Sequence, residues 1–237
     1  MDKRENFIKI LSLIKDMPDK SLDGTVTELL EVFDLEGNPL GFQEREKFYA
    51  EIKEQFARDG KITRQVKSIR ALLLNPSGRV YLQKRSLDKS ENPGLYDKSV
   101  GGHVLARISY ELTLVKECAE ELGLPAAIST PSEFDAALRS IDLRVIGIFR
   151  QVDYIAPFLS SRVDRGSFTF TQPFMSAFFI GYYDGPIRFA DGESTGIEVF
   201  SLDQLRHEIT INSTRFTEDL KVMVERYSPY IVPLKRP

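Results

Sequence analysis

The stretch that most constrains this chain is residues 101–124, GGHVLARISYELTLVKECAEELGL. Two glycines open it, a helix-forming run follows from about residue 109 to 122, and Gly123 stands where helices commonly end. This order predicts a strand, a loop, a helix and a glycine cap.

The expected helix has two unlike sides. Apolar side chains share one side, because successive residues advance by about 100° around the axis: Leu112, Val115, Ala119 and Leu122. Glu117, Glu120 and Glu121, at i, i+3 and i+4, cluster on roughly the opposite side. Like charges at these spacings repel by a few tenths of a kcal/mol. A bound divalent cation would remove this repulsion.

The length, composition and charge of the chain limit the class of protein it can be. Its 237 residues suit one large domain, or one domain with an appended segment, and 42% hydrophobic with 28% charged residues is typical of a globular protein. A net charge of -3 gives no bulk attraction to nucleic acid or anionic lipid, so any phosphate binding must be local. No apolar run approaches 18 residues, and the single cysteine, Cys118, fits a reducing compartment. We expect a soluble cytoplasmic protein.

Local patterns predict a mixed sheet covered by helices on both faces. Before residue 101 we expect these elements: a helix at 3–16, strands at 25–33 and 40–43, a helix at 44–58, and a hairpin of strands 66–74 and 79–84. After residue 124 we expect a short helix at 132–139 capped by Ser132, strands at 144–152, 168–183 and 197–200, a helix from 201, and a last helix at 213–226. The connection 153–166 is long enough to suggest a function.

The central stretch resembles a known family. Gly102 followed by residues 116–124, KECAEELGL, is similar to the Nudix box: glycine, five residues, glutamate, seven residues, arginine-glutamate, an aliphatic, any residue, two glutamates, any residue, glycine, an aliphatic. YLQKRS, NPGLYDKSVGGHV and GESTGIEVFSLDQL give a context that resembles the Nudix branch related to isopentenyl diphosphate isomerase. The resemblance covers roughly residues 25–225.

This resemblance implies a fold and a chemistry. The fold would be α/β, an α/β/α sandwich with a central mixed β-sheet, formed by residues 61–237 and preceded by an extension of residues 1–60. The family hydrolyses diphosphate linkages with Mg²⁺ or Mn²⁺, a cation that keeps waters and substrate oxygens in its shell. By resemblance, Glu117, Glu120 and Glu121 bind the metal, and Glu120 or Glu121 orients or deprotonates water. Glu193 is a further ligand or general base, or a solvated loop residue.

The glycines and the flanking cations complete the expected site. Gly101 and Gly102 would bring the backbone close to the metal, where side chains are excluded. A second group, near the end of one strand and before the glycines, would meet substrate phosphates or simply be solvated: Lys84, Arg85 and Lys98. Aromatic side chains after residue 148 would stack a nucleobase or fill the core: Phe149, Tyr154, Phe158, Phe170 and Phe174.

The chain departs from the box at two places. Ile108 stands where the first glutamate is expected, and Arg107 and Leu105 lie where many relatives have glycine and glutamate. Lys116 replaces the arginine and keeps its charge, but it lacks the planar fork that pairs with carboxylates. These departures keep open a non-catalytic module that binds and senses a nucleotide or diphosphate.

Isomerase activity is not expected. The isomerase, by the same resemblance, needs a catalytic cysteine in a loop and a metal held by several histidines. Cys118 falls on the packed side of the expected helix, and His103 and His207 are the only histidines. We therefore expect a hydrolase that acts on a small diphosphate substrate, with no nucleic acid or membrane partner. The specific substrate and the formation of a homodimer stay open.

Overall fold

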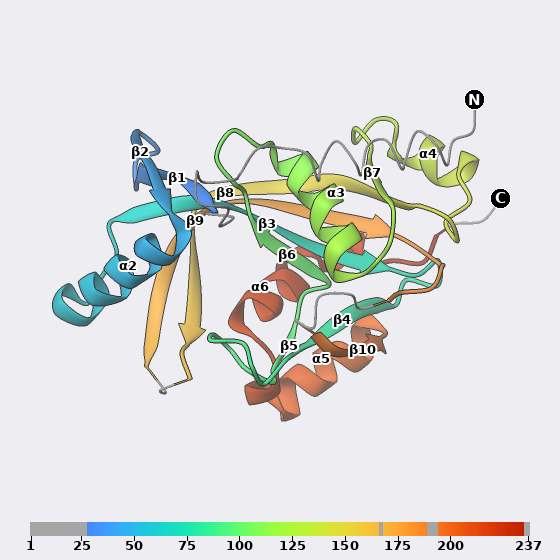
Figure 1. Cartoon of the computed structure of the whole chain (residues 1–237). Helices are drawn as coiled ribbons and strands as arrows, with labels where there is room; N and C mark the ends of the chain where they lie inside the picture. The colour runs from blue at the N-terminus through green and yellow to red at the C-terminus, as the bar shows by residue number, and fades with distance from the viewer. Residues whose placement is uncertain (1–27, 166–167, 189–193, 235–237) are drawn as a thin grey trace.

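The structure is a computed structural model that describes residues 28–165, 168–188 and 194–234 (Figure 1). Its strands are β1 (Leu29–Asp34), β2 (Pro39–Glu44), β3 (Arg64–Leu74), β4 (Val80–Arg85), β5 (Tyr96–Asp97), β6 (Val100–His103), β7 (Ala126–Ile128), β8 (Gly147–Val163), β9 (Thr169–Tyr182) and β10 (Ser194–Phe200). Its helices are α2 (Arg45–Asp59), α3 (Tyr110–Glu121), α4 (Phe134–Ser140), α5 (Leu202–Ile211), α6 (Glu218–Tyr227) and the short η1 (Ser213–Arg215) and η2 (Ser228–Tyr230).

β3 is a central strand of one mixed sheet. It pairs in parallel with β9 from Val66 to Leu74, and antiparallel with β1, β6 and β4 at successive points along its other edge. The strand order is β10-β4-β3-β9-β8-β7. β3 is buried at almost every position, as expected for a strand covered on both faces. The predicted α/β/α sandwich is confirmed.

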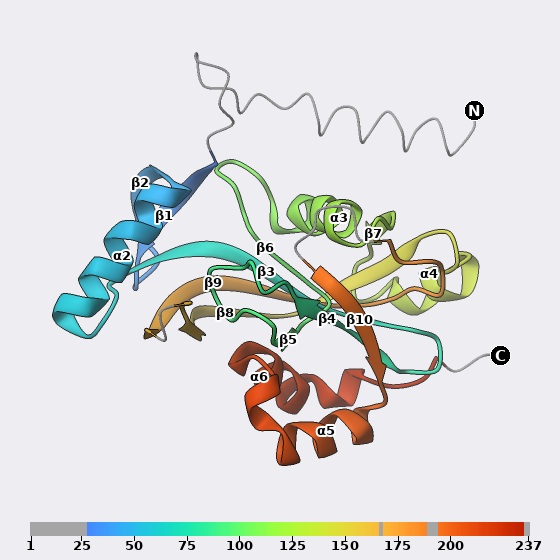
Figure 2. The ribbon, with the colours of Figure 1, turned by 60° about the horizontal axis from the view of Figure 1, so that its bottom comes forward.

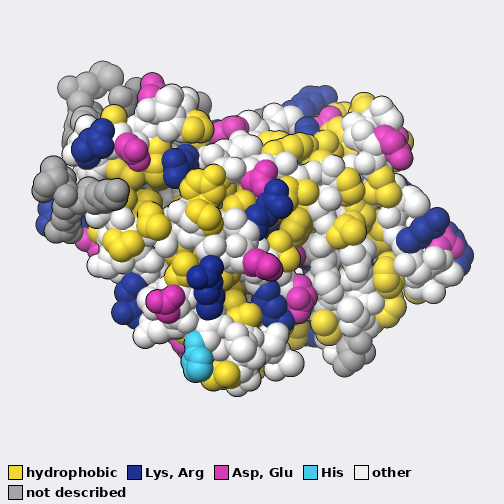
Figure 3. Space-filling model, turned by 180° about the vertical axis from the view of Figure 1, so that it is seen from behind, with side chains coloured by type: hydrophobic (Ala, Val, Ile, Leu, Met, Phe, Trp, Pro, Cys, Tyr) yellow, Lys and Arg dark blue, Asp and Glu magenta, His cyan; other side chains and the backbone are white. Residues whose placement is uncertain are grey.

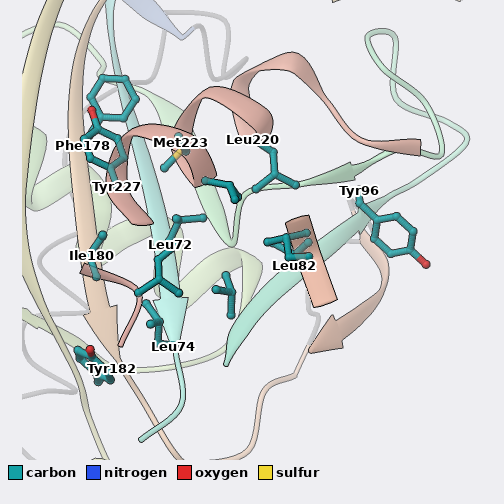
Figure 4. Close-up of a cluster of buried hydrophobic side chains, with 14 of the residues drawn as sticks. Leu72, Leu74, Leu82, Tyr96, Phe178, Ile180, Tyr182, Leu220, Met223 and Tyr227 are labelled. Carbon is teal, nitrogen blue, oxygen red and sulfur yellow. The ribbon is translucent and has the colours of Figure 1, made fainter. Parts of the chain in front are cut away.

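The two faces of this sheet carry separate cores, because successive strand residues point to opposite sides. Figure 2 shows α3 on one face and α5 and α6 on the other. Ile69, Ala71 and Leu73 of β3 pack in the cluster under α3. Leu72 and Leu74 pack on the opposite side with Met223 and Tyr227 of α6 (Figure 4).

A third core joins α2 to the sheet. Phe48 and Ile52 of α2 are fully buried against Val66 of β3 and Phe170 and Phe174 of β9. β1 also pairs with the first residues of β3. The described part of the predicted N-terminal extension is therefore built into the sheet, while the expected helix at 3–16 lies outside the described residues. The boundary at residue 60 stays a prediction.

Three local predictions were wrong. Residues 153–163 belong to β8, because the strand continues past Asp153 and pairs with β9 through two register shifts, so no long loop separates the two. α4 begins after Glu133, without a side-chain cap from Ser132. The last helix is broken near Phe216, and α6 begins after Thr217, which caps it with a hydroxyl that accepts from the Leu220 N–H.

The surface agrees with the near-neutral composition. On the face seen in Figure 3, Lys and Arg side chains are interspersed with Asp and Glu. Over the described ranges, every helix is too short or too polar to cross a lipid bilayer.

Candidate active site

A pocket of about 650 Å³ lies between α2 and α3, with residues of β3 and β6 between them. One side of it is formed by the central stretch singled out in the sequence. Its lining residues there are Gly101, Gly102, Lys116, Glu117, Glu120 and Glu121. The structure thus brings together all but one of the residues predicted from the box, and Gly123 caps the helix that carries them in a left-handed conformation with φ 61°.

The side of α3 that is buried sets the direction of its glutamates, and this side differs from the predicted one. Ser109 caps the helix, and its hydroxyl accepts from the Leu112 N–H at 3.1 Å. Leu114, Cys118 and Leu122, at i, i+4 and i+8, are fully buried under the helix. The predicted apolar side was right for Leu122 and for Val115, which is partly buried against the same core, and wrong for Leu112 and Ala119, because the buried stripe is rotated toward Cys118. The buried position predicted for the cysteine is confirmed.

The three glutamates have unlike surroundings. Glu121 is 7% exposed, and its Oε2 accepts a 2.8 Å hydrogen bond from Gln83 Nε2. Glu117 lies against Gly102, where an added Cβ would come within 2.4 Å of Glu117 Oε1. Glu120 has a half-exposed side chain that forms an ion pair with Lys116 at 3.6 Å. Glu121 is therefore held from the sheet, whereas Glu120 reaches toward solvent.

The two glycines provide room rather than a turn. Both lie in β6, where they pair with Arg70 and Ile69 of β3. A Cβ on Gly101 would come within 2.3 Å of the Lys98 side chain, as one on Gly102 would meet Glu117. Because the two glycines lack side chains, the Lys98 side chain and the Glu117 carboxylate can lie directly against β6.

Carboxylates on an open wall suit Mg²⁺, which commonly takes one or two of them and fills its shell with water and phosphate oxygens. Among the described residues, His, Cys, Asp and Glu side chains do not gather in threes around a point that could hold a metal. Glu117 lies in the space left by Gly102, and Glu121 lies one turn further along the same side of α3. The residues present therefore fit an open cation site of one or two carboxylates better than a closed protein cage.

The rest of the lining carries the opposite charge. The box side has three glutamates and Lys116, a formal charge of -2. Elsewhere the described lining has four acidic residues and seven basic ones, a formal charge of +3. The acidic residues are Glu28, Glu46, Glu91 and Asp97, and the basic ones are Arg45, Lys53, Arg70, Arg85, Lys89, Lys98 and Arg162. The pocket therefore has an acidic part on α3, here called the acidic wall, and a net positive charge over the rest of its lining, here called the basic wall.

Asp97 orders two cations of the basic wall. Lys98 Nζ lies 3.1 Å from its carboxylate, and Arg85 Nη1 donates to it at 3.2 Å. Thr217 Oγ1 donates to its other oxygen at 2.8 Å. Burial opposes ionisation here, but Lys98 and Arg85 outweigh it and lower the pKa of Asp97. The predicted phosphate contacts Arg85 and Lys98 thus line the pocket as ordered cations.

Arg70 is the most deeply buried cation of this wall. It is 1% exposed, and its Nε donates to Asp219 Oδ2 at 3.0 Å across from α6. Its Nη1 donates to Ser176 at 2.6 Å, and its guanidinium lies 4.8 Å from the Phe174 ring centre. A charge at this depth is tolerated because it is both paired and hydrogen-bonded.

α2 supplies a part of the site that the sequence did not reveal. Gln172 Nε2 donates to Tyr49 Oη at 3.2 Å, which leaves the tyrosine hydroxyl to donate to His103 Nε2. Burial and the nearby Arg45 and Arg162 lower the pKa of His103, so its ring is neutral and can accept. α2 is thereby tied to β6 beside the glycines.

A set of ion pairs joins α2 to the β8–β9 hairpin. Lys53 Nζ lies 2.8 Å from Asp164 Oδ2 and 3.7 Å from Glu91 Oε1, and Arg162 pairs with the same Glu91. These partners are up to 111 positions apart in the chain. Residue spacing alone carries no signal for such pairs, so only the fold identifies them.

Several predicted residues lie elsewhere. Lys84 points away from the pocket and lies 5.6 Å from the Tyr96 ring centre, and Glu193 lies outside the described residues. Ile108 is partly buried against the core under α3, and Arg107 keeps a left-handed φ of 66°. Of the aromatic residues predicted to stack a base or fill the core, Phe149, Phe158, Phe170 and Phe174 are buried and take the second role. Tyr154 takes neither role, because it is 45% exposed, lies against Tyr110 and is not among the described lining residues of the pocket.

Comparison with known proteins agrees with this geometry. The profile of the NUDIX domain matches residues 64–220. This chain therefore belongs to the Nudix family. A crystal structure of DR0079 from Deinococcus radiodurans has the same fold, with a TM-score of 0.57 and 21% identity, covering 84% of this chain and 98% of that one.

Two curated proteins share part of the sequence. A prenyl-diphosphate phosphatase of Methanosarcina mazei is 34% identical over 96 residues, which are 40% of this chain and 49% of the relative. An uncharacterised Nudix hydrolase of Pseudomonas aeruginosa is 35% identical over 101 residues, which are 43% and 53% of the two chains. The chain thus spans about half the length of the curated relatives it matches.

Proposed function

We propose that this chain hydrolyses the diphosphate linkage of a nucleoside diphosphate derivative or a related organic diphosphate, with Mg²⁺ or Mn²⁺ as cofactor. The observation that carries the proposal is the pocket lining, which is acidic on α3 and has a net positive charge elsewhere. Such a pair of walls suits a cation and a polyanion bound side by side. The phosphatase named among the relatives also acts on a diphosphate, which supports the reaction class.

The box carboxylates would have different roles in cation binding and catalysis, according to their surroundings. Glu117 and Glu121 would hold the cation, because both face the pocket and Glu121 is fixed by Gln83. The cation, when bound, neutralises charge on the phosphates and acidifies a water. Glu120 is the general base we favour among the described residues, since its half-exposed carboxylate can reach a pocket water. Glu193 stays a predicted alternative.

The basic wall would receive the diphosphate itself. Lys98 lies on Gly101 within the pocket, and Arg85 shares its partner Asp97. Charge-assisted hydrogen bonds from these groups orient phosphate oxygens against the box. Both cations are restrained by Asp97, so little side-chain freedom is lost when the ligand binds.

A second function, binding without hydrolysis, has one observation in its favour. Ile108 removes a carboxylate from the box and packs its side chain toward the core instead. A pocket with fewer carboxylates could retain the ligand without activating water. The same binding residues would then serve a sensor of nucleotides or other diphosphates.

Hydrolysis is tested by measuring the phosphomonoester, phosphate or pyrophosphate products formed from nucleotide sugars, dinucleotides, nucleoside triphosphates and coenzyme A, with Mg²⁺ and with Mn²⁺. We compare the wild type with Glu121→Gln and with the control Glu111→Gln, an exposed residue on the same helix that does not line the pocket. We expect turnover of at least one compound, lost by about 100-fold or more in Glu121→Gln only. Binding without turnover in the wild type would favour the sensor.

A further inference from the structure

The N-terminal end of α6 supports cations of the basic wall, although α6 lies on the face of the sheet opposite α3 (Figure 2). Asp219, in the first turn of α6, accepts from Arg70 Nε at 3.0 Å. Thr217, the cap of the same helix, donates through Oγ1 to Asp97 Oδ1 at 2.8 Å. Asp97 in turn holds two further cations of the pocket: Arg85 and Lys98. Side chains at one helix end therefore support cations of the pocket, directly or through Asp97.

Thr217 is held firmly against the strand that carries Asp97. Its N–H donates to the Tyr96 carbonyl at 2.9 Å, and its hydroxyl accepts from the Leu220 N–H at 3.3 Å. Tyr96 and Asp97 are the two residues of β5, so Thr217 fixes this short strand to α6. Thr217 is buried and is not among the described residues that line the pocket.

The Thr217 hydroxyl makes one more hydrogen bond than a helix cap requires. An N-cap needs an oxygen that accepts from a backbone N–H. Ser201 caps α5 in this way, since its hydroxyl accepts from the Gln204 N–H at 3.2 Å. Thr217 also donates its proton to a carboxylate that is 5% exposed. Hydrogen bonds to ionised groups are the stronger ones, so this additional bond can orient Asp97.

The direction of the Asp97 carboxylate decides where the two cations lie. Oδ2 accepts from Arg85 Nη1 at 3.2 Å, and Lys98 Nζ lies 3.1 Å from both oxygens. Lys98 is the next residue in the chain, so its bonds to Asp97 leave the two free to shift together. Thr217 is 120 positions away and is fixed on another element. Its hydroxyl therefore sets the direction of the carboxylate relative to the rest of the fold.

We propose that Thr217 is a positioning residue for the reaction, and that it acts through Asp97 to hold Lys98 and Arg85 in the orientation that binds the diphosphate. The inference rests on the proposed function, since these cations have this role only if the pocket binds a diphosphate. It assigns a role in substrate binding to a buried side chain outside both the box and the pocket lining.

The test separates the hydrogen-bond donor from the helix cap. Thr217→Val removes the hydroxyl with little change in shape, and Thr217→Ser keeps it. Ser201→Ala is the control, because it removes the cap of α5 at a residue that is not among the described lining residues. If Thr217→Val does not fold, Thr217→Gly takes its place, since glycine is tolerated at a helix cap.

Two measurements are made on each variant. Calorimetry gives the Kd of methylenediphosphonate, a diphosphate analogue that resists hydrolysis, in the presence of Mg²⁺. Steady-state kinetics give kcat and KM for a compound that the wild type hydrolyses. Urea unfolding reports stability, so that a loss of the cap is seen separately from a loss of binding.

We expect Thr217→Val to weaken methylenediphosphonate binding by about threefold to tenfold and to raise KM by a similar factor, with kcat nearly unchanged. Thr217→Ser should keep nearly the wild-type Kd. Ser201→Ala should lower stability without changing Kd. These results would show that the donor, and not the cap, supports binding.

An unchanged Kd in Thr217→Val, an equal loss of binding in Ser201→Ala, or a Thr217→Ser variant as weak as Thr217→Val would overturn the inference. The proposed hydrolysis fails separately, through turnover that does not depend on Glu121, or through no turnover at all while the Kd values still decide the role of Thr217.

Discussion

The two walls of the pocket are held in place by different forces. The acidic wall belongs to one helix, α3, which is anchored by fully buried Leu114, Cys118 and Leu122. The basic wall is assembled from α2, β3, β4, β8 and the segments between, and ion pairs such as those of Arg70 and Lys53 join its parts. Apolar packing thus fixes the carboxylates, while charge pairing fixes the cations.

Because of this difference, substitutions in the two walls should have different effects on stability and activity. Apolar burial is insensitive to pH, whereas a buried ion pair depends on both of its partners. Breaking an ion pair of the basic wall should therefore lower stability as well as activity, whereas moving a carboxylate of the acidic wall should lower activity with little loss of stability. The predictions below test this contrast.

The largest effect is expected when the deepest ion pair is broken. Asp219→Asn leaves the buried Arg70 guanidinium without a counter-charge, which should lower the free energy of unfolding by about 3–5 kcal/mol. Urea unfolding measures this loss. Glu218→Gln, at the exposed neighbouring position, is the control and should change stability by less than about 0.5 kcal/mol. Similar losses in both variants would show that the pair does not hold the basic wall.

The acidic wall should respond to a change in space. Gly102→Ala places a methyl group within 2.4 Å of Glu117 Oε1, so the carboxylate must move. We expect the rate of diphosphate hydrolysis to fall by about tenfold or more, with little change in urea unfolding. Gly101→Ala meets the Lys98 side chain instead, leaves Glu117 in place and should reduce activity less. An equal loss in both variants would mean that the position of Glu117 is not what matters.

A smaller effect is expected from pH at the junction of the walls. Burial lowers the pKa of His103, so the unfolded chain, with a histidine pKa near 6.5, binds more protons below that pH. Stability should therefore be full above pH 6.5 and decline by about 1 kcal/mol between pH 6.5 and 5.5. His103→Gln keeps an acceptor for Tyr49 and should remove this decline, as followed by thermal or urea unfolding. His207 remains in both proteins, so a decline of the same size in the variant would assign it elsewhere.

The smallest effect is expected at the loop before α3. Arg107 has φ 66°, a region that costs a residue with a side chain about 1 kcal/mol relative to glycine. Arg107→Gly should therefore raise the free energy of unfolding by up to about 1 kcal/mol without changing activity. A loss of stability would show that the contact of Arg107 with the Phe42 ring outweighs the backbone strain.

The sequence was sufficient to predict the acidic wall, but of the basic wall it predicted only Arg85 and Lys98. The helix-forming run from about residue 109 to 122 and Gly123 are local signals, and they predicted α3 almost to the residue. Lys53 and Arg162 carry no local signal, since their positions depend on pairing between distant strands. The residues after Asp153 were predicted to form a loop. They continue β8 instead, because pairing with β9 supports the strand through its register shifts, and this pairing is not visible in the local sequence.

The buried stripe of α3 was misplaced for a related reason. Helical periodicity fixes which residues share a side, but the sheet decides which side is buried. Glu121 illustrates this, because Gln83 of the neighbouring strand β4 accommodates a carboxylate at a position that is 7% exposed. Such a partner is not visible in the pattern of the helix.

The measurement that tests the central claim most directly is the binding of methylenediphosphonate, a diphosphate that cannot be hydrolysed, with and without Mg²⁺. If the two walls form one site, the cation and the anion should each tighten the other by the same factor, about tenfold or more. Calorimetry with the wild type should show this coupling, and Glu121→Gln should lose it. Anion binding that is the same with and without Mg²⁺ would contradict the account.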